Sequence, residues 1–80
     1  MAEKVRGRIV THLRAWRMAR SLQQGELADE AHVSRSTIIR AEAGGIVSFS
    51  NIRKLASALN VSVDDLLYSD PNPKIRATAA

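Results

Sequence analysis

The residues with the clearest chemical capacity lie in the segment from Arg35 to Arg40, which reads RSTIIR. If this segment is helical and Ile38 points into a core, four neighbouring side chains share the outward face. They are Arg35, Ser36, Ile39 and Arg40. Arginine can bind guanine through two hydrogen bonds, serine can bond a base or a phosphate, and isoleucine can contact a thymine methyl group. These four residues are therefore predicted to contact bases in the major groove of DNA.

Composition supports a small binding module better than an enzyme. The chain has 80 residues, no cysteine and two histidines, so thiolate chemistry is absent and a histidine-based metal site lacks ligands. We find no Ser/His/Asp arrangement and no glycine-rich phosphate loop, and we expect no catalytic residues, no cofactor, no metal and no small-molecule ligand. The net charge of +4 favours a polyanionic partner.

The elements that must position the Arg35–Arg40 segment are predicted to be helices. Apolar residues recur at helical spacing, and we find no alternating run long enough for a strand. The spacing predicts five short helices in one all-α core: residues 5–20, 24–31 and 35–43, a fourth that begins at Ser48 and is ended by Asn60, and a fifth that starts with the Ser62 cap and stops before residue 69. Serine residues at helix-capping positions precede the last three of these segments: Ser34, Ser48 and Ser62.

The first of these helices is expected to bury one face. Val5, Ile9, Leu13 and Trp16 follow one another at spacings of four, four and three residues. Two arginines off this stripe, Arg14 and Arg20, are either phosphate contacts or part of a solvated helix face.

The ends of the chain differ from its middle. Residues 1–8 are predicted to form a basic lead-in, residues 9–68 a single DNA-binding domain, and residues 69–80 a flexible tail that begins near Pro71 and Pro73. No apolar run is long enough to span a membrane and no secretory signal stands out, so the cytoplasm is the expected compartment.

Several motifs in fixed order resemble the Cro/C1-type, or XRE-like, helix-turn-helix family. They are Leu13-x-x-x-Arg17, Leu22-x-Gln24-x-Glu26-Leu27-Ala28, Val33-Ser34-Arg35-Ser36-Thr37-Ile38, Glu42-x-Gly44 and the stretch from Leu55 to Leu66. Together they cover about two thirds of the chain. The resemblance implies a five-helix, lambda-repressor-like domain in which residues 35–43 form the recognition helix.

The resemblance also implies roles for single residues. Arg17 and Glu42 match a buried ion pair between the first and third helices. Gln24 matches a residue that contacts phosphate while it braces the recognition helix. Six residues are predicted to contact DNA phosphates: Gln24, Ser34, Thr37, Gly45, Ser48 and Asn51. The sequence departs from the family pattern at His32, which replaces the usual turn glycine where a positive φ is often needed, and histidine tolerates that better than most residues. It also departs in the loop from Gly44 to Val47, which lacks the proline often found before the fourth helix.

The function implied is sequence-specific regulation of transcription by a homodimer on a palindromic or pseudo-palindromic operator, with autoregulation and RNA polymerase as a further partner. Small controller proteins of restriction–modification systems resemble this chain in length. The predicted dimer surface consists of Val61, Val63, Leu66, Leu67 and Tyr68. The alternative is an antitoxin-like or other protein-interaction module in which DNA binding is secondary.

Overall fold

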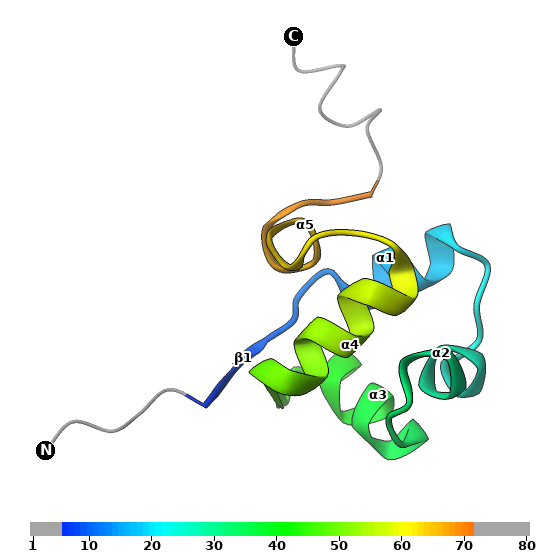
Figure 1. Cartoon of the computed structure of the whole chain (residues 1–80), viewed down its shortest axis with the longest axis horizontal. Coiled ribbons are helices and arrows are strands. Elements are labelled where there is room, and N and C mark those ends of the chain that lie inside the picture. Colours follow the sequence, from blue (N-terminus) through cyan, green and yellow to red (C-terminus); the bar gives the residue numbers. More distant parts are fainter. Residues whose placement is uncertain (1–5, 72–80) are drawn as a thin grey trace, which may run out of the picture.

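The computed structural model describes residues 6–71, which form five helices and a small two-stranded sheet (Figure 1). In chain order the elements are β1 (Gly7–Ile9), α1 (Leu13–Ala19), α2 (Gln24–Ala31), α3 (Arg35–Glu42), β2 (Ile46–Ser48), α4 (Phe49–Leu59) and α5 (Val63–Tyr68). The predicted five-helix fold is confirmed, and the two-stranded sheet is an element that helical periodicity does not predict.

Serine side chains begin three of the helices, as predicted. The hydroxyl oxygens of Ser34, Ser48 and Ser62 each accept a hydrogen bond from the backbone amide three residues further on, at 3.1, 3.2 and 3.0 Å. Each bond satisfies an amide that has no partner inside its own helix. The start of α3 and the start of α4 are thus fixed by the local sequence.

Left-handed residues end two of the helices and set the turns that follow. His32 ends α2 with φ 59°, which confirms the positive φ expected at this position, and Asn60 ends α4 with φ 60°. Gly44, which follows α3, has φ 99°. Histidine and asparagine enter this region more readily than most residues with a side chain, and glycine enters it without steric cost.

The prediction for the first helix is wrong in its N-terminal half. The helix begins at Leu13 instead of residue 5, and Gly7–Ile9 form β1. Ile9, which was expected on the buried face, is 53% exposed. The cause is a partner far along the chain, because this segment pairs with β2 instead of continuing the helix. The predicted contribution of Val5 lies outside the described residues.

The two strands form an antiparallel ribbon, which we call the β1–β2 ribbon. Gly7 lies opposite Ser48, Arg8 opposite Val47, and Ile9 opposite Ile46. β1 crosses the boundary expected between residues 8 and 9, and the predicted flexible tail lies largely outside the described residues.

The core is apolar throughout and lies between α4 and the other helices (Figure 1). No buried polar residue is found among residues 6–71. Fully buried side chains come from every helix and from the segment before α1: Val10, Leu13, Leu27, Ile38, Ile52, Leu55, Leu59 and Leu66. No helix in this part of the chain is long and apolar enough to cross a membrane.

Candidate nucleic-acid interface

α3 is anchored by its inner side, so its outer side is free to bind. Ile38 and Ala41 are buried against α2, whose Leu27 and Ala28 are buried in the same core. Small alanine side chains at this contact allow the two helices to approach closely. The four residues predicted to contact bases form what we call the outer face of α3, and all are exposed: Arg35, Ser36, Ile39 and Arg40.

A nearly buried polar network locks the end of α3 to α1. Arg17 donates two hydrogen bonds to the carboxylate of Glu42, Nε to Oε2 at 2.6 Å and Nη2 to Oε1 at 3.0 Å. The two side chains are only 12% and 8% exposed. A third donor of Arg17, Nη1, bonds the carbonyl oxygen of Leu22 at 2.8 Å. The structure therefore contains the ion pair that the family resemblance implied.

This network also affects charge and the position of α2. The hydrogen bond from Arg17 to Glu42 raises the pKa of Arg17. Burial of the guanidinium would lower that pKa, but the hydrogen bond has the larger effect. Gln24 joins the network, because its Nε2 donates to Glu42 Oε1 at 3.1 Å. Gln24 thus braces α3 from α2. One of the two N–H donors of its side-chain amide is thus used within the protein, and its predicted phosphate contact stays a prediction.

Four of the predicted contact residues come together in one surface groove. Thr37 and Arg40 of α3 line it with Ser48 and Asn51 at the start of α4. We call this the contact groove, and its complete lining is Thr37, Arg40, Ile46, Val47, Ser48 and Asn51. Residues from two helices and the intervening strand thus meet along one side of α3.

The remaining predicted phosphate contacts lie beside the groove. Ser34 shares a hydrogen bond with Thr37 between the two hydroxyl oxygens, at 2.9 Å. Gly45 packs against Arg40, since a Cβ at Gly45 would lie 2.8 Å from Arg40 Cγ and 2.9 Å from its carbonyl oxygen. Gly45 therefore lets the chain turn tightly over the arginine stem. Ile46 was assigned to no DNA contact from the sequence, yet it lines the groove beside Arg40.

Two other side chains singled out in the sequence have structural roles. The Trp16 indole nitrogen donates to the carbonyl oxygens of Asp65 and Ser69, at 3.2 and 3.0 Å. Arg20 Nε donates to the carbonyl oxygen of Leu59 at 3.0 Å, and its guanidinium lies 5.3 Å from the Trp16 ring centre. Both side chains donate to carbonyl oxygens near helix ends. This bond does not decide whether Arg20 contacts a phosphate or belongs to a solvated helix face.

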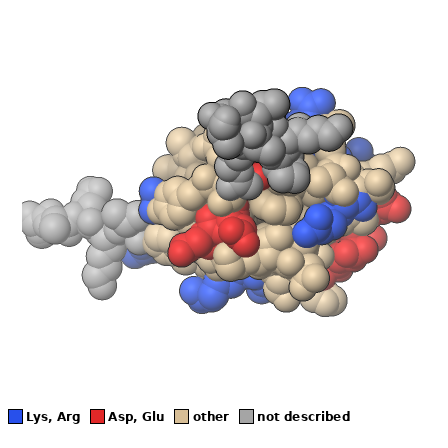
Figure 2. All heavy atoms as spheres, turned by 90° about the horizontal axis from the view of Figure 1, so that it is seen from above, with Lys and Arg blue, Asp and Glu red and all other residues tan. Residues whose placement is uncertain are grey.

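Charge is distributed unevenly around the domain. α3 carries Arg35 and Arg40 on its outer face, and its one acid, Glu42, is paired with Arg17. Figure 2 shows acidic side chains gathered over α5, whose first turn contains the exposed Asp64 and Asp65. Exposed acids also lie on α2, whereas the outer face of α3 has exposed arginines and no exposed acid of its own.

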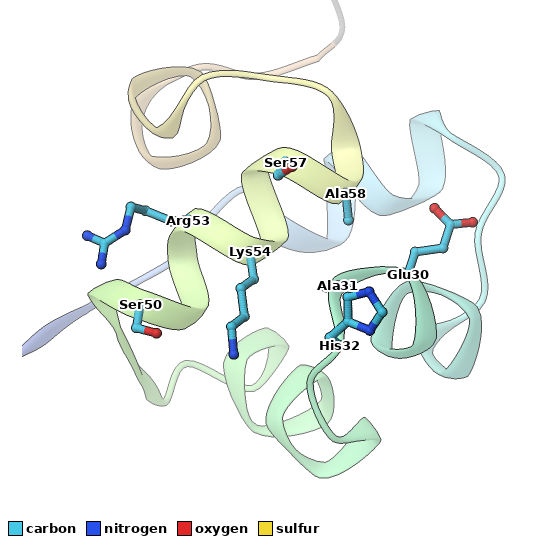
Figure 3. Close-up of a pocket in the computed structure, with 8 residues that line it drawn as sticks. All are labelled: Glu30, Ala31, His32, Ser50, Arg53, Lys54, Ser57 and Ala58. Carbon is cyan, nitrogen blue, oxygen red and sulfur yellow. The ribbon is translucent and has the colours of Figure 1, made fainter.

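A second hollow lies between α2 and α4 and contains none of the predicted contact residues (Figure 3). Its lining includes Glu30, Arg53 and Lys54. Figure 3 shows the charged ends of these three side chains pointing away from one another. The hollow does not present converging groups to one small ligand. No cluster of potential metal-binding side chains occurs in the described part of the chain.

The residues predicted to form a dimer surface divide into two groups. Leu66 is completely buried, and including it in the surface was wrong because its side chain fills the core beneath α5. Val61, Val63 and Leu67 are partly exposed beside the core, and Tyr68 is 59% exposed. Their role in a dimer stays a prediction.

Comparison with known proteins identifies the fold with a DNA-binding family. A family model described as helix-turn-helix matches residues 13–66, which is more than half of the chain. A comparison with curated protein sequences gave no significant match. The chain is similar to the structure of the restriction-modification controller protein C.AhdI from Aeromonas hydrophila. That similarity has 39% identity and a TM-score of 0.67, and it covers 69% of this chain and 85% of C.AhdI.

Two further similar structures contain DNA. The master regulator for biofilm formation SinR, in complex with DNA, is 28% identical with a TM-score of 0.68, over 74% of this chain and 97% of SinR. The P22 c2 repressor, in complex with a synthetic operator, is 28% identical with a TM-score of 0.68, over 79% of this chain and 97% of the repressor. With the family match over residues 13–66, these similarities show that the chain belongs to the XRE-like helix-turn-helix family of DNA-binding regulators.

Proposed function

We propose that this protein is a sequence-specific transcriptional regulator that binds a pseudo-palindromic operator as a homodimer. One such operator is proposed to lie upstream of its own gene. The observation that carries the proposal is the contact groove, which gathers Thr37, Arg40, Ser48 and Asn51 beside the outer face of α3. Side chains suited to bases and side chains suited to phosphates thus share one surface.

The chemistry of this surface suits double-stranded DNA. Arg35 and Arg40 supply bidentate donors for guanine, and the exposed Ile39 supplies an apolar contact for thymine. The hydroxyl groups of Ser48 and Thr37 offer short donors for phosphate oxygens. A surface that bound phosphate alone would have little use for an exposed isoleucine between two arginines.

A dimer follows from the size of the interface. One recognition helix buries little surface, and operator-grade affinity commonly requires two helices in successive major grooves, about 34 Å apart. The partly exposed apolar side chains beside α5 support a self-association surface: Val61, Val63, Leu67 and Tyr68. The similar proteins SinR and the P22 c2 repressor are described in complex with DNA, which supports DNA binding by this chain and leaves the dimer a proposal of its own.

The test is a titration of the protein into a labelled duplex from immediately upstream of its own gene, with a scrambled duplex of equal length alongside. Specific binding should exceed scrambled binding by about a thousandfold or more. The double variant Arg35→Ala/Arg40→Ala should lose that preference. Arg53→Ala/Lys54→Ala is the matched control, because it removes two exposed cations of α4 that line the second hollow and not the contact groove.

Each part of the proposal has its own contradicting result. Equal, weak binding to both duplexes, unchanged in the double variant, would overturn sequence-specific regulation and favour a protein-interaction module. Sedimentation at micromolar concentration tests the assembly, and a monomer both free and on DNA would overturn the homodimer. A half-site duplex that binds as tightly as the full site would overturn the palindromic operator.

A further inference from the structure

The β1–β2 ribbon brings an arginine from outside the helix-turn-helix to the beginning of α4. The carbonyl oxygen of Arg6 accepts a hydrogen bond from the amide of Phe49, at 3.2 Å. Phe49 is the first residue of α4 and directly follows Ser48 of the contact groove. Arg6 precedes the segment that matches the family, residues 13–66, so family resemblance gives this position no role.

A close backbone approach fixes the ribbon in this place. A Cβ on Gly7 would lie 2.0 Å from the carbonyl oxygen of Val47, so only glycine fits there without displacing the backbone. Gly7 is paired with Ser48, which places β1 directly against the residue that caps α4. The backbone of Arg6 is therefore held beside the groove by its own bond to Phe49 and by the pairing of Gly7 with Ser48.

Two arginines flank Gly7 and differ in their surroundings. Arg8 donates from Nη1 to the hydroxyl oxygen of Tyr68 at 2.5 Å, and its guanidinium lies 5.3 Å from the centre of the same ring. Arg8 thus ties β1 to α5. Arg6 is exposed, and its side chain has no hydrogen bond or ion pair with any residue in the described part of the chain. Its charge is unpaired within residues 6–71.

We propose that the β1–β2 ribbon extends the DNA interface beyond the helix-turn-helix, and that Arg6 binds a backbone phosphate next to those reached from the contact groove. This inference rests on the proposed function and adds an element to the same surface. Because a phosphate contact carries no sequence information, Arg6 increases affinity and fixes register for any duplex alike.

The first test measures how binding depends on salt. Removing one phosphate contact reduces the slope of log K against log salt by about 0.9, so Arg6→Gln reduces it by about 1.8 for a dimer. Between about 50 and 200 mM salt, the affinity of the wild-type protein should then fall about tenfold further than that of the variant. Arg6→Lys keeps the charge and should keep the slope.

Arg53→Gln is the matched control, because it removes the same charge from an exposed arginine of α4 that lines the second hollow and not the contact groove. A slope unchanged in Arg53→Gln but lowered in Arg6→Gln supports a contact at the ribbon. Equal effects of the two variants would overturn it, since net charge alone would then explain the reduction. If wild-type protein prefers the upstream duplex over the scrambled one while Arg6→Gln matches wild type, the ribbon proposal fails and the proposed function stands.

A second measurement locates the contact. Single phosphates of the duplex are replaced by uncharged methylphosphonates, one position at a time. Wild-type protein should bind more weakly when one particular position is replaced, and Arg6→Gln should be insensitive to that position while sharing all the other sensitive ones. Identical patterns for the two proteins would overturn the assignment of Arg6. Circular dichroism and a urea midpoint equal to those of wild type ensure that a change reports on binding and not on folding.

Discussion

The helix-turn-helix of α2 and α3 is held together by many buried side chains, whereas the β1–β2 ribbon is held by backbone pairing and a single buried large side chain, Val47. In the first region, Ile38 and Leu27 are fully buried, and Arg17 and Glu42 form a two-bond ion pair that is nearly shielded from water. In the ribbon, the cross-strand partners Ile9 and Ile46 are 53% and 69% exposed. Burial of these two side chains therefore contributes little to the stability of the ribbon.

This difference shows how one small domain can combine a rigid reading element with a marginal one. The helix-turn-helix must hold several side chains in a fixed register to read bases, and buried packing provides that rigidity. A contact with phosphate tolerates a less rigid support because it requires charge and approximate position. Substitutions in the two regions should therefore differ in their effects on stability and on DNA affinity, and the following variants test this.

The largest effect is expected from Glu42→Ala. This change leaves the guanidinium of Arg17 in a nearly buried site without its anion, and the free energy of unfolding should fall by about 3 kcal/mol. Glu42→Gln keeps an acceptor for Arg17 and should cost less. Urea denaturation followed by circular dichroism measures both, with exposed Glu30→Ala as the control. A decrease below about 0.5 kcal/mol for Glu42→Ala would show that the network does not hold α3 in place.

Gly7→Ala should have the next largest effect, and it acts on the ribbon. The added methyl group would overlap the Val47 carbonyl oxygen, and relieving that overlap should cost about 1–3 kcal/mol of unfolding free energy. Gly25→Ala is a matched control, because a Cβ there meets nothing within 4 Å and Gly25 lies in α2. It should stabilise the protein by about 0.5 kcal/mol. Equal changes for both variants would contradict the close ribbon contact.

Arg40→Ala should separate affinity from stability. Arg40 is exposed, so the urea midpoint should change little, while affinity for the upstream duplex should fall by about 1–3 kcal/mol. The decrease should be larger on that duplex than on the scrambled one, because Arg40 is proposed to read a base. Arg6→Gln should weaken both duplexes equally. If Arg40→Ala also weakens both equally, the helix-turn-helix and the ribbon would not differ in the way that the comparison requires.

The same contrast explains which features were predictable from the sequence. Helices α2 to α5 depend on signals within a few residues, such as the caps at Ser34, Ser48 and Ser62, and their positions were predicted within about one residue. The Arg17–Glu42 pair links residues 25 positions apart, and only resemblance to a family indicated it. Local periodicity alone contains no information about such a partner.

The ribbon could not be predicted from local periodicity because its two strands are three residues each and lie far apart in the sequence. Ile9 falls at helical spacing from Leu13, so the pattern favoured a continuous helix. Gly7 was the available signal, since a glycine within a predicted helix weakens it and can indicate close backbone approach. The gathering of four contact residues in one groove likewise depends on tertiary packing that brings α3 and the start of α4 together.

The smallest effect is expected at the turn between α2 and α3. His32 adopts φ 59°, a conformation that strains residues with a side chain, whereas glycine adopts it freely. His32→Gly relieves that strain but increases the entropy of the unfolded chain, so the net gain should be about 0.5 kcal/mol. Asn60→Gly, at φ 60°, is the matched comparison and should gain less, because asparagine tolerates this region better. Urea midpoints measure the stability of both variants. DNA affinity should not change in His32→Gly, because the exposed His32 lines the hollow between α2 and α4 and not the contact groove. A decrease in stability for His32→Gly would mean that the imidazole holds the turn through its own contacts. The rigidity of the helix-turn-helix would then extend to its turn, where His32 stands in place of the glycine that the family pattern has.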